Sequence, residues 1–523
     1  MPALAREVAA NAATQWRASR ASTDKPGEVR VLYPGDAPVA AVAIGTQHGA
    51  PEHVPDTRVP ADEYLRNERS ERARLAAAKG VRALRDVGVA KVDGEDHHIA
   101  VDAFGSAHAA AVGANLGLWR VNHFKSRGAV PAWNADAQRK GGQHVTAQPL
   151  DGDASDAAKK QLRDDEDALR GTGTPLSWWT GEVYAKAQNW SRELQETPSN
   201  LLTPTGFAER IVAAFRGVPN TTVHVRDEAW ARKERMNLFL SVAHGSDEPL
   251  RFVEVVYHGA PDHDAALLAF VGKGITFDTG GISIKPSAGM DLMRADMGGA
   301  AAAVSATLGI AQLGLPINVV CVTPITENMP SGHATKPGDI FQARNGLTVQ
   351  VDNTDAEGRL ILADALSYTS ETYRPHTLVD IATLTGAAVI AVGDLYSAVF
   401  TESDPLWQEL RRVGEAEHDL FWRLPLNDAY LPQISQTNAD LVNTGGRPAG
   451  SCTAAIFLKQ FVHGLEDRSK GAEGMPRLRY AHIDIAGSMD ADKNTLNEYQ
   501  GKGLTGRPVR ALIELARRAA YSG

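Results

Sequence analysis

Short apolar runs alternate with longer periodic stretches through the second half of the chain. The runs predict buried strands, at residues 265–271, 317–322, 377–381 and 480–485. Between them, the stretches at 298–313 and 358–373 show the apolar pattern of helices. Strands that alternate with helices are typical of parallel sheets covered on both faces. We therefore predict a larger C-terminal α/β domain with a central mixed, mostly parallel sheet flanked by helices.

The first half of the chain carries a weaker pattern. A strand is predicted at 39–44 and a helix at 109–118, which indicates a smaller α/β domain. Residues 131–175 hold glycines and a run of Asp and Lys residues with little apolar periodicity, so we expect a polar insertion there. The predicted division is a flexible tail at 1–28, the N-terminal α/β domain at 29–175, a linker helix at 176–198 and the large domain at 199–523.

Length and composition agree with two folded domains. The 523 residues exceed the roughly 250 to 300 that one hydrophobic core organises, and 43% hydrophobic with 22% charged residues is ordinary for a globular protein. The net charge of -9 argues against a nucleic-acid surface, which needs concentrated Lys and Arg. Cys321 and Cys452 form no CxxC pair, and the chain shows neither a membrane-spanning run nor a signal-peptide pattern. We therefore expect a cytoplasmic protein, with neither membrane nor nucleic acid as a partner.

Charged residues gather in two glycine-rich segments, one after a predicted strand and one before a predicted helix. The segments read GKGITFDTGGISIKPSAGMDLMRADMGG at 272–299 and DNTDAEGRL at 352–360. Among the charged side chains that they supply, the candidates are the carboxylates of Asp278, Asp296, Asp355 and Glu357 and the cationic side chains of Lys273, Lys285 and Arg359. Ligand sites in open α/β sheets form at such strand ends, so we expect the two segments to meet in one pocket.

Four carboxylates in one pocket raise each other's pKa unless positive charge lies among them. Two divalent ions supply that charge, and carboxylate oxygens suit hard or borderline divalent cations and can bridge two of them. Taken singly, each aspartate is more often a helix cap or a turn residue, and each lysine is more often a surface charge. The combination in two segments favours a two-metal site.

Other catalytic motifs are absent or incomplete. The segment from Gly272 resembles GxGxxG but has Phe277 at the last position, which argues against dinucleotide binding. The segment at 352–358 resembles a calcium loop but has Thr354 where Asp or Asn is expected. HExxH, GxSxG and the P-loop signature do not occur, and the sixteen histidines form no zinc pattern. These observations exclude the zincin, α/β-hydrolase and P-loop classes by signature.

The two segments resemble the leucyl aminopeptidase family, the cytosol aminopeptidases of peptidase family M17. The resemblance rests on GKGITFDTGG, SIKPSAGMD, DMGGAA and NTDAEGRL, and it extends to ETPSN at 196–200, ENMPSG at 327–332, TLTG at 383–386 and HIDIAG at 482–487. It covers residues 178–510, whereas the N-terminal half matches only weakly. Thr279 stands where the family usually has Ser, and Arg294 where it usually has Lys.

The resemblance implies roles for individual residues. Lys273, Asp278, Asp296 and Glu357 look like ligands of one metal, and Asp278, Asp355 and Glu357 look like ligands of the other. Lys273 must be neutral to donate a lone pair, which two nearby cations would enforce by lowering its pKa. Lys285 resembles the family's catalytic lysine, whose charge stabilises the gem-diolate, and Arg359 resembles the residue that holds a bicarbonate acting as general base.

Further residues match the family's substrate-binding positions. Leu384 lies where a backbone carbonyl of the family contacts the substrate. Asn353 is a further substrate-binding position, and its side chain is polar. The apolar pocket for the N-terminal side chain would be formed by Met293, Thr383, Gly386, Ala486 and Met489. Ordinary core packing is the alternative for these pocket residues. A pocket that contains Met adapts to Leu or Met side chains.

The implied function is a two-metal aminopeptidase that hydrolyses the N-terminal residue of peptides, preferably leucine or another apolar residue, by a metal-activated water. The implied cofactors are two divalent ions per subunit, Mn or Zn with Mg or Co as alternatives, and bicarbonate. The N-terminal domain would be macro-domain-like, and the subunits would form a homohexamer as a dimer of trimers. Two alternatives stay open, a DNA-binding or scaffolding relative and a dipeptidase of the Cys-Gly type.

Overall fold

The chain divides into two compact units, one made mainly of Met1–Asn189 and the other mainly of Trp190–Asn494 with Lys502–Gly523. The division falls inside helix α6 (Trp178–Glu196), where we predicted a linker helix. The computed structural model describes residues 3–21, 28–32, 39–43, 61–86, 97–102, 106–121, 124, 145–149, 176–262, 266–465, 478–490 and 503–521. The predicted limits of the domains stay a prediction.

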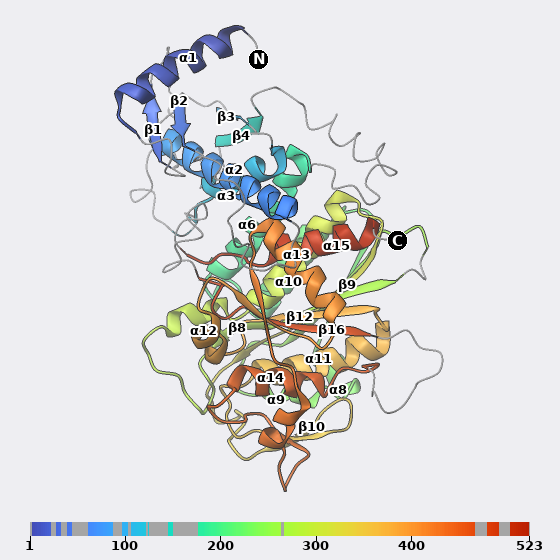
Figure 1. The fold of residues 1–523 in the computed structure, drawn as a ribbon. Coiled ribbons are helices and arrows are strands. Elements are labelled where there is room, and N and C mark those ends of the chain that lie inside the picture. Colours follow the sequence, from blue (N-terminus) through green and yellow to red (C-terminus); the bar gives the residue numbers. More distant parts are fainter. Residues whose placement is uncertain are drawn as a thin grey trace. The chain divides into compact units, whose positions relative to one another are not determined.

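The described part of the N-terminal unit combines helices with short strands (Figure 1). Its elements are α1 (Ala3–Ala18), β1 (Val29–Leu32), β2 (Val39–Val42), α2 (Ala61–Asp86), β3 (His97–Val101), α3 (Ala107–Leu118) and β4 (Val145–Pro149). Strands β1 and β2 pair antiparallel, and β3 and β4 pair parallel. Small side chains such as Ala77 of α2 and Ala110 of α3 share one buried cluster with Val81, so these helices pack closely. The unit is α/β, as predicted.

Residues 3–18, in the segment that we predicted to be a flexible tail, form helix α1. The segment is rich in alanine, the strongest helix former. Trp16 is buried in a cluster with Leu32 and Ala43, which holds the helix against the β1–β2 hairpin. Of the predicted polar insertion, Val145–Pro149 form β4, and the remainder of 131–175 lies outside the described residues.

The C-terminal unit is built on a nine-stranded sheet with the order β14-β13-β16-β12-β7-β9-β6-β5, and β8 pairs with β9. The strands are β5 (Thr221–Arg226), β6 (Arg251–His258), β7 (Leu267–Gly272), β8 (Gly274–Asp278), β9 (Asn318–Asn328), β12 (Thr377–Ala382), β13 (Ser397–Phe400), β14 (Phe421–Leu424) and β16 (Arg479–Asp484). The central strands β16, β12, β7 and β9 are mutually parallel, whereas β5, β6 and β13 enter antiparallel pairs. The predicted mixed, mostly parallel sheet is confirmed.

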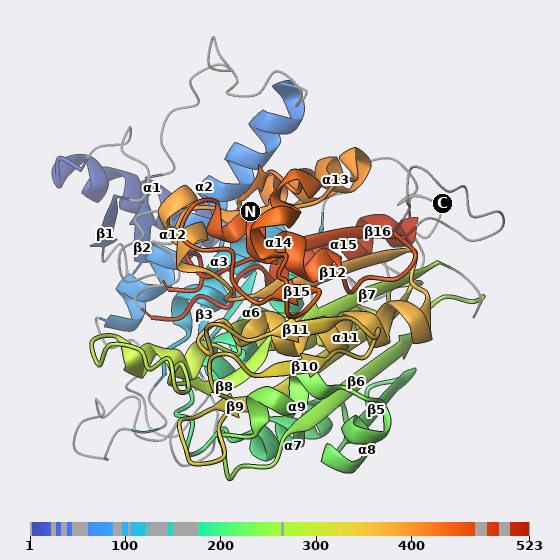
Figure 2. The same ribbon diagram turned by 90° about the horizontal axis from the view of Figure 1, so that it is seen from below.

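Helices cover both faces of this sheet. One layer contains α10 (Gly298–Leu313), α13 (Asp404–Glu417) and α15 (Val509–Tyr521), and the other contains α9 (Asn237–Ala243), α11 (Gly358–Tyr373) and α14 (Gly450–Lys459). Figure 2 looks onto the second layer. The remaining elements are α7 (Pro204–Phe215), α8 (Glu228–Lys233), α12 (Gly386–Val392), the 3-10 helices η3 (Met290–Ala295) and η4 (Asp428–Ile434), and a small sheet of β10 (Ile340–Gln342), β11 (Thr348–Gln350) and β15 (Leu441–Val442).

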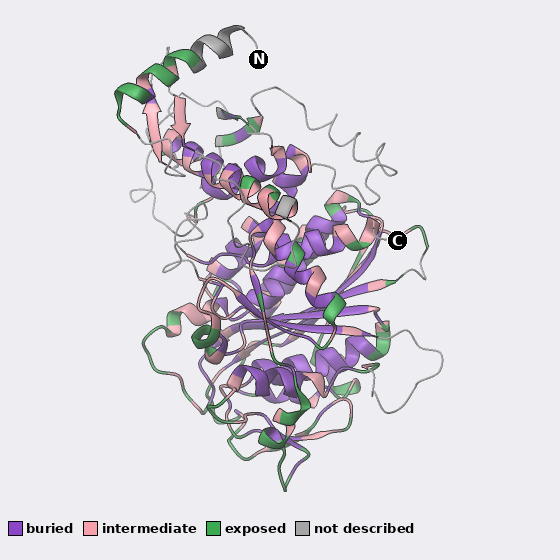
Figure 3. Ribbon diagram, in the orientation of Figure 1, coloured by how far each residue is buried: buried purple, intermediate pink, exposed green. Residues whose placement is uncertain are grey.

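The core lies between these layers, where the central strands are buried along most of their length (Figure 3). All six residues of β12 are buried, as a strand covered on both faces requires. Helix α10 begins directly against this strand, since a Cβ on Gly299 would lie 1.9 Å from the carbonyl oxygen of Ile381. None of the helices in the described part of the chain has the length and hydrophobicity needed to cross a membrane.

Candidate active site

The functional residues predicted from the sequence come together at one edge of the large sheet. Strands β7, β12 and β16 run parallel, so their carboxyl ends lie at the same edge, where open α/β sheets bind ligands. Lys273 directly follows β7, Thr383 directly follows β12, and Asp278 ends β8. Asp296 lies between η3 and α10, and Glu357 directly precedes α11.

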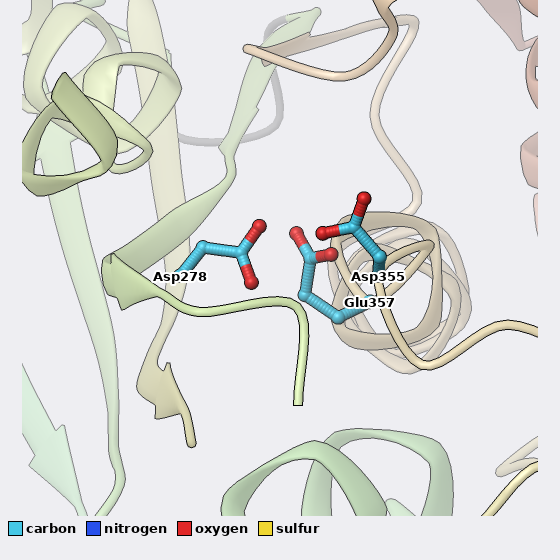
Figure 4. A group of neighbouring side chains, drawn as sticks. All are labelled: Asp278, Asp355 and Glu357. Carbon is cyan, nitrogen blue, oxygen red and sulfur yellow. The ribbon is translucent and has the colours of Figure 1, made fainter. Parts of the chain in front are cut away.

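Three carboxylates form the centre of the site. Asp278, Asp355 and Glu357 each offer an oxygen atom that lies within 4.8 Å of the other two. Figure 4 shows Asp278 reaching from the end of a strand toward Asp355 and Glu357, which lie in the segment that leads into a helix. Asp278 and Glu357 are buried, and Asp355 is partly exposed. The expected convergence of the two segments is therefore observed for these side chains.

Two lysines each form ion pairs with two of the four carboxylates. The Nζ atom of Lys273 lies 2.9 Å from Asp296 Oδ1 and 2.7 Å from Glu357 Oε1. The Nζ atom of Lys285 lies 2.7 Å from Asp278 Oδ2 and 2.5 Å from Asp355 Oδ1. Lys273 also donates to the carbonyl oxygen of Thr383 at 2.9 Å, so its amine is fixed from three sides.

Burial and charge act in opposite directions on the groups of the site. Burial raises the pKa of Asp296 well above its usual value, and the neighbouring Lys273 opposes that shift. Burial also raises the pKa of Asp278, and the Glu357 carboxylate adds to the effect. Burial would lower the pKa of Lys273, but Asp296, Glu357 and Asp278 outweigh it and the pKa is raised. These carboxylates thus favour the charged form of Lys273.

The donor set fits a divalent cation. Carboxylates within 4.8 Å of one another can share an ion, and hard cations prefer such oxygen ligands. Asp296 Oδ2 is buried and has no hydrogen-bond partner among the described residues, so this carboxylate can accept a further cation. The ammonium groups of Lys273 and Lys285 place positive charge between the carboxylates of the cluster. A bound metal ion supplies positive charge in the same way in such sites.

Neighbouring groups hold the carboxylates in place. Asp278 Oδ1 accepts from Asn328 Nδ2 at 2.8 Å and from the N–H of Gly280 at 2.9 Å. Asp296 Oδ1 accepts from the Thr383 hydroxyl at 2.7 Å. These bonds leave the carboxylates little rotational freedom, as a preformed binding site requires.

Arg359 lies in the first turn of α11, two residues after Glu357, and is buried. Its Nη1 atom donates to the carbonyl oxygen of Asn443 at 2.7 Å. Burial lowers the pKa of Arg359 to about 10, although the carboxylates of Glu357 and Asp484 oppose the shift. The guanidinium is therefore a buried cation beside the acidic cluster, as the predicted anion-binding role requires.

The predicted substrate-binding residues lie on the loops around this edge. Thr383 and Leu384 follow β12, Gly386 begins α12, and Ala486 follows β16. Asn353 lies before the acidic pair, and its Oδ1 accepts from the N–H of Asp355 at 2.9 Å. Met293 lies in η3 and is half-buried. Met489 is buried in a cluster with Ala295 and Leu504, which agrees with the core-packing alternative for this residue.

Comparison with known proteins decides the family. Residues 189–513 match the cytosol aminopeptidase family, catalytic domain. The chain belongs to this family. The cytosol aminopeptidase of Homo sapiens is 44% identical over 451 residues, which cover 86% of the chain and 76% of the relative. That of Dictyostelium discoideum is 48% identical over 342 residues, which cover 65% and 63%. The resemblance inferred from the sequence blocks is confirmed.

Solved structures of related enzymes agree in fold with this aminopeptidase. The bottromycin maturation enzyme BotP in complex with Mn superposes with a TM-score of 0.75 at 31% identity, covering 97% of this chain and 96% of that one. A mutant of tomato leucine aminopeptidase gives 0.73 at 26% identity, covering 97% and 88%. The overall architecture is therefore that of leucine aminopeptidases.

Asp484, a buried residue of the aminopeptidase at the end of β16, was not among the predicted site residues. Its Oδ1 accepts from the N–H groups of Leu384 and Ala486, both at 3.1 Å, and its Oδ2 accepts from the Thr385 hydroxyl at 2.7 Å. It thus ties together two loops that carry predicted substrate-binding residues. The available signal was an acidic residue at the end of a buried strand, inside the HIDIAG block at 482–487.

Replacing Asp484 with alanine should raise the KM for an aminoacyl amide by about tenfold or more, with a smaller effect on kcat. The reason is that three donors lose a buried charged acceptor, a loss worth about 1.5 to 3 kcal/mol per bond. Steady-state kinetics of Asp484→Ala and Asp484→Asn measure the effect. The asparagine variant keeps an acceptor oxygen and should recover most of the affinity. Equal defects in the two variants would contradict the positioning role.

Proposed function

We propose that this aminopeptidase releases leucine or another apolar residue from the N-terminus of peptides, using two divalent ions per subunit and a water molecule as nucleophile. The observation that carries the proposal is the cluster of Asp278, Asp355 and Glu357, whose oxygens lie within 4.8 Å of one another beside two buried or half-buried lysines. Family membership supplies the reaction class. The substrate is a peptide with a free amino terminus.

The chain offers ligands for both ions. Lys273, Asp278, Asp296 and Glu357 would hold one, and Asp278, Asp355 and Glu357 would hold the other. Divalent ions in such a site supply Lewis acidity, which polarises a carbonyl and lowers the pKa of water. Lys273 would have to lose its proton to act as a ligand, and the positive charge of the ions favours that loss. Mn and Zn are the proposed metals, with Mg or Co as alternatives, and the structure of BotP in complex with Mn supports Mn.

Two groups of the chain would act on the substrate directly, and a third would act through a bound anion. Lys285 enters the site with 20% of its side chain exposed, so its ammonium can approach the scissile carbonyl and stabilise negative charge on its oxygen. Arg359 would hold a bicarbonate ion, which would accept the proton of the attacking water. The backbone carbonyl of Leu384, on the loop that Asp484 holds, would accept a hydrogen bond from the substrate.

The preference for apolar residues would come from one pocket. Met293, Thr383, Gly386, Ala486 and Met489 would surround the N-terminal side chain, while Asn353 would contact the residue that follows. A methionine side chain is flexible and polarisable, so such a pocket accepts leucine and methionine more readily than a rigid one. A charged side chain would lose its hydration there without a partner.

Two further properties belong to the same proposal. We infer a cytoplasmic enzyme, because the relatives are named cytosol aminopeptidases and both cysteines of the chain are free and buried. We also infer a homohexamer, as a dimer of trimers, from the family resemblance. Light scattering of the purified protein tests the assembly.

The decisive experiment is a substrate panel with and without metal. Purified protein with Mn or Zn should release p-nitroaniline from Leu-p-nitroanilide, and EDTA should abolish the release until metal is restored. Leucyl and methionyl amides should exceed the aspartyl amide by more than about tenfold in kcat/KM, because the pocket is apolar. Activity that persists in EDTA would reject the metal dependence. Hydrolysis confined to Cys-Gly would identify the dipeptidase instead.

A further inference from the structure

A buried asparagine outside the predicted site holds the loop that carries two of its acidic residues. Asn443 directly follows β15, is fully buried and is far in sequence from both charged segments. Strand β15 pairs in parallel with β11, so that Gln350 lies opposite Val442. This pairing brings Asn443 beside the loop at 351–357, which connects β11 to α11.

The Asn443 side chain makes four hydrogen bonds to that loop. Its Oδ1 accepts from the N–H groups of Asp352 at 2.9 Å and Asn353 at 3.3 Å. Its Nδ2 donates to the carbonyl oxygens of Asn353 at 2.7 Å and Ala356 at 3.3 Å. Both hydrogens and both lone pairs of the amide are therefore used.

The Asn443 backbone adds two bonds that reach the same elements. Its N–H donates to Gln350 at 3.0 Å, at the end of β11. Its carbonyl oxygen accepts from Arg359 Nη1 at 2.7 Å, on the first turn of α11. Asn443 thus holds both the loop that precedes Glu357 and the guanidinium group of Arg359, which follows it.

We propose that Asn443 is a positioning residue of the peptidase, which sets the orientation of Asp355, Glu357 and Arg359 without touching substrate or metal. The inference rests on the proposed two-metal function, which gives those three residues their roles. Only an amide serves here, because the loop presents two N–H groups and two carbonyl oxygens to one side chain. An aspartate would keep the acceptors but would set negative charge against the carbonyl oxygens of Asn353 and Ala356.

The test compares Asn443→Ala and Asn443→Asp with a matched control, Asn345→Ala. Asn345 also joins two backbone segments, since it donates to Gln460 at 3.1 Å and accepts from Leu347 at 3.1 Å, but it lies in the β10–β11 turn. Both Asn443 variants should bind Mn about 10 to 100-fold more weakly by calorimetry, the usual effect of losing a group that supports metal ligands. Their kcat at saturating Mn should also fall, because Arg359 loses its orientation. Asn345→Ala should match the wild type in both.

Hydrogen exchange of metal-free protein separates this inference from the proposed function. The amides of residues 352–360 should exchange at least about tenfold faster in the Asn443 variants than in the wild type, while those of β12 stay protected. Unchanged exchange in this loop, or Mn affinity equal to that of Asn345→Ala, would overturn the positioning role. If the wild type itself binds no Mn, the two-metal proposal fails, and the exchange rates still decide the role of Asn443.

Discussion

Replacing Glu357 with alanine is expected to abolish divalent-metal binding and to lower peptidase turnover by roughly a thousandfold. Glu357 is buried, lies 2.7 Å from Lys273 Nζ and belongs to the cluster with Asp278 and Asp355. Removing this carboxylate takes away the negative charge that both ions would share. A metal contributes several kcal/mol to transition-state stabilisation, which corresponds to a factor of this size. Metal analysis after dialysis, together with kcat for Leu-p-nitroanilide, measures the outcome.

The same helix provides the control for this substitution. Glu371 lies in the last turns of α11, is exposed and pairs with Arg344. Glu371→Ala removes a glutamate near the other end of α11 but leaves the acidic cluster intact, so its metal content and kcat should equal those of the wild type. If Asp355→Ala and Glu357→Ala both keep full activity, the two-metal proposal is wrong.

Replacing Lys285 with alanine should lower kcat by about a hundredfold or more while metal binding is kept or strengthened. The fall in kcat follows from the loss of a positive charge that would stabilise the developing oxyanion, an effect of about 10² to 10³ for comparable donors. The metal is kept because Lys285 lies beside Asp278 and Asp355, at 2.7 and 2.5 Å, where its ammonium competes with a cation for the same oxygens. Single-turnover kinetics and calorimetry with Mn measure the two effects separately.

An exposed lysine controls for loss of charge in general. Lys336 is 69% exposed and pairs with Asp339 three residues away, so Lys336→Ala should change neither kcat nor Mn affinity. Lost metal in Lys285→Ala would show that this lysine supports the metal centre instead of acting on the substrate. Unchanged turnover would remove it from the catalytic machinery altogether.

Helices and strands of the C-terminal unit were largely predictable because their signals are local. Helices predicted at 298–313 and 358–373 are α10 and α11 with the same limits. The predicted strand at 377–381 is β12, one residue longer. Gly314 in the left-handed conformation ends α10, and Pro375 lies two residues after the end of α11. Glycine and proline at these positions are local signals that a helix ends. The N-terminal helix α1 was missed because it mixes polar residues with alanine, and one buried tryptophan anchors it.

The residues that hold the site together were not predictable in the same way. Asn443 contacts a loop 90 residues earlier in the chain, and Asp484 contacts Leu384 from 100 residues away. An asparagine after a two-residue strand carries no local sign of such a role. Its four bonds exist only because β15 pairs with β11 and places the amide against the loop.

By itself, the sequence determined the family, the α/β class and the two segments that carry the charged residues, because each of these depends on motifs or apolar patterns within short stretches of the chain. Only the tertiary structure decided which charges meet. Lys273 pairs with Asp296 and Glu357, whereas Lys285 pairs with Asp278 and Asp355. Lys273 follows β7 and Asp278 ends β8, and both strands pair in parallel with β9, whereas Asp355 and Glu357 precede α11. Only the packing of these distant elements brings their charged side chains together, and no spacing along the chain encodes the distances between them.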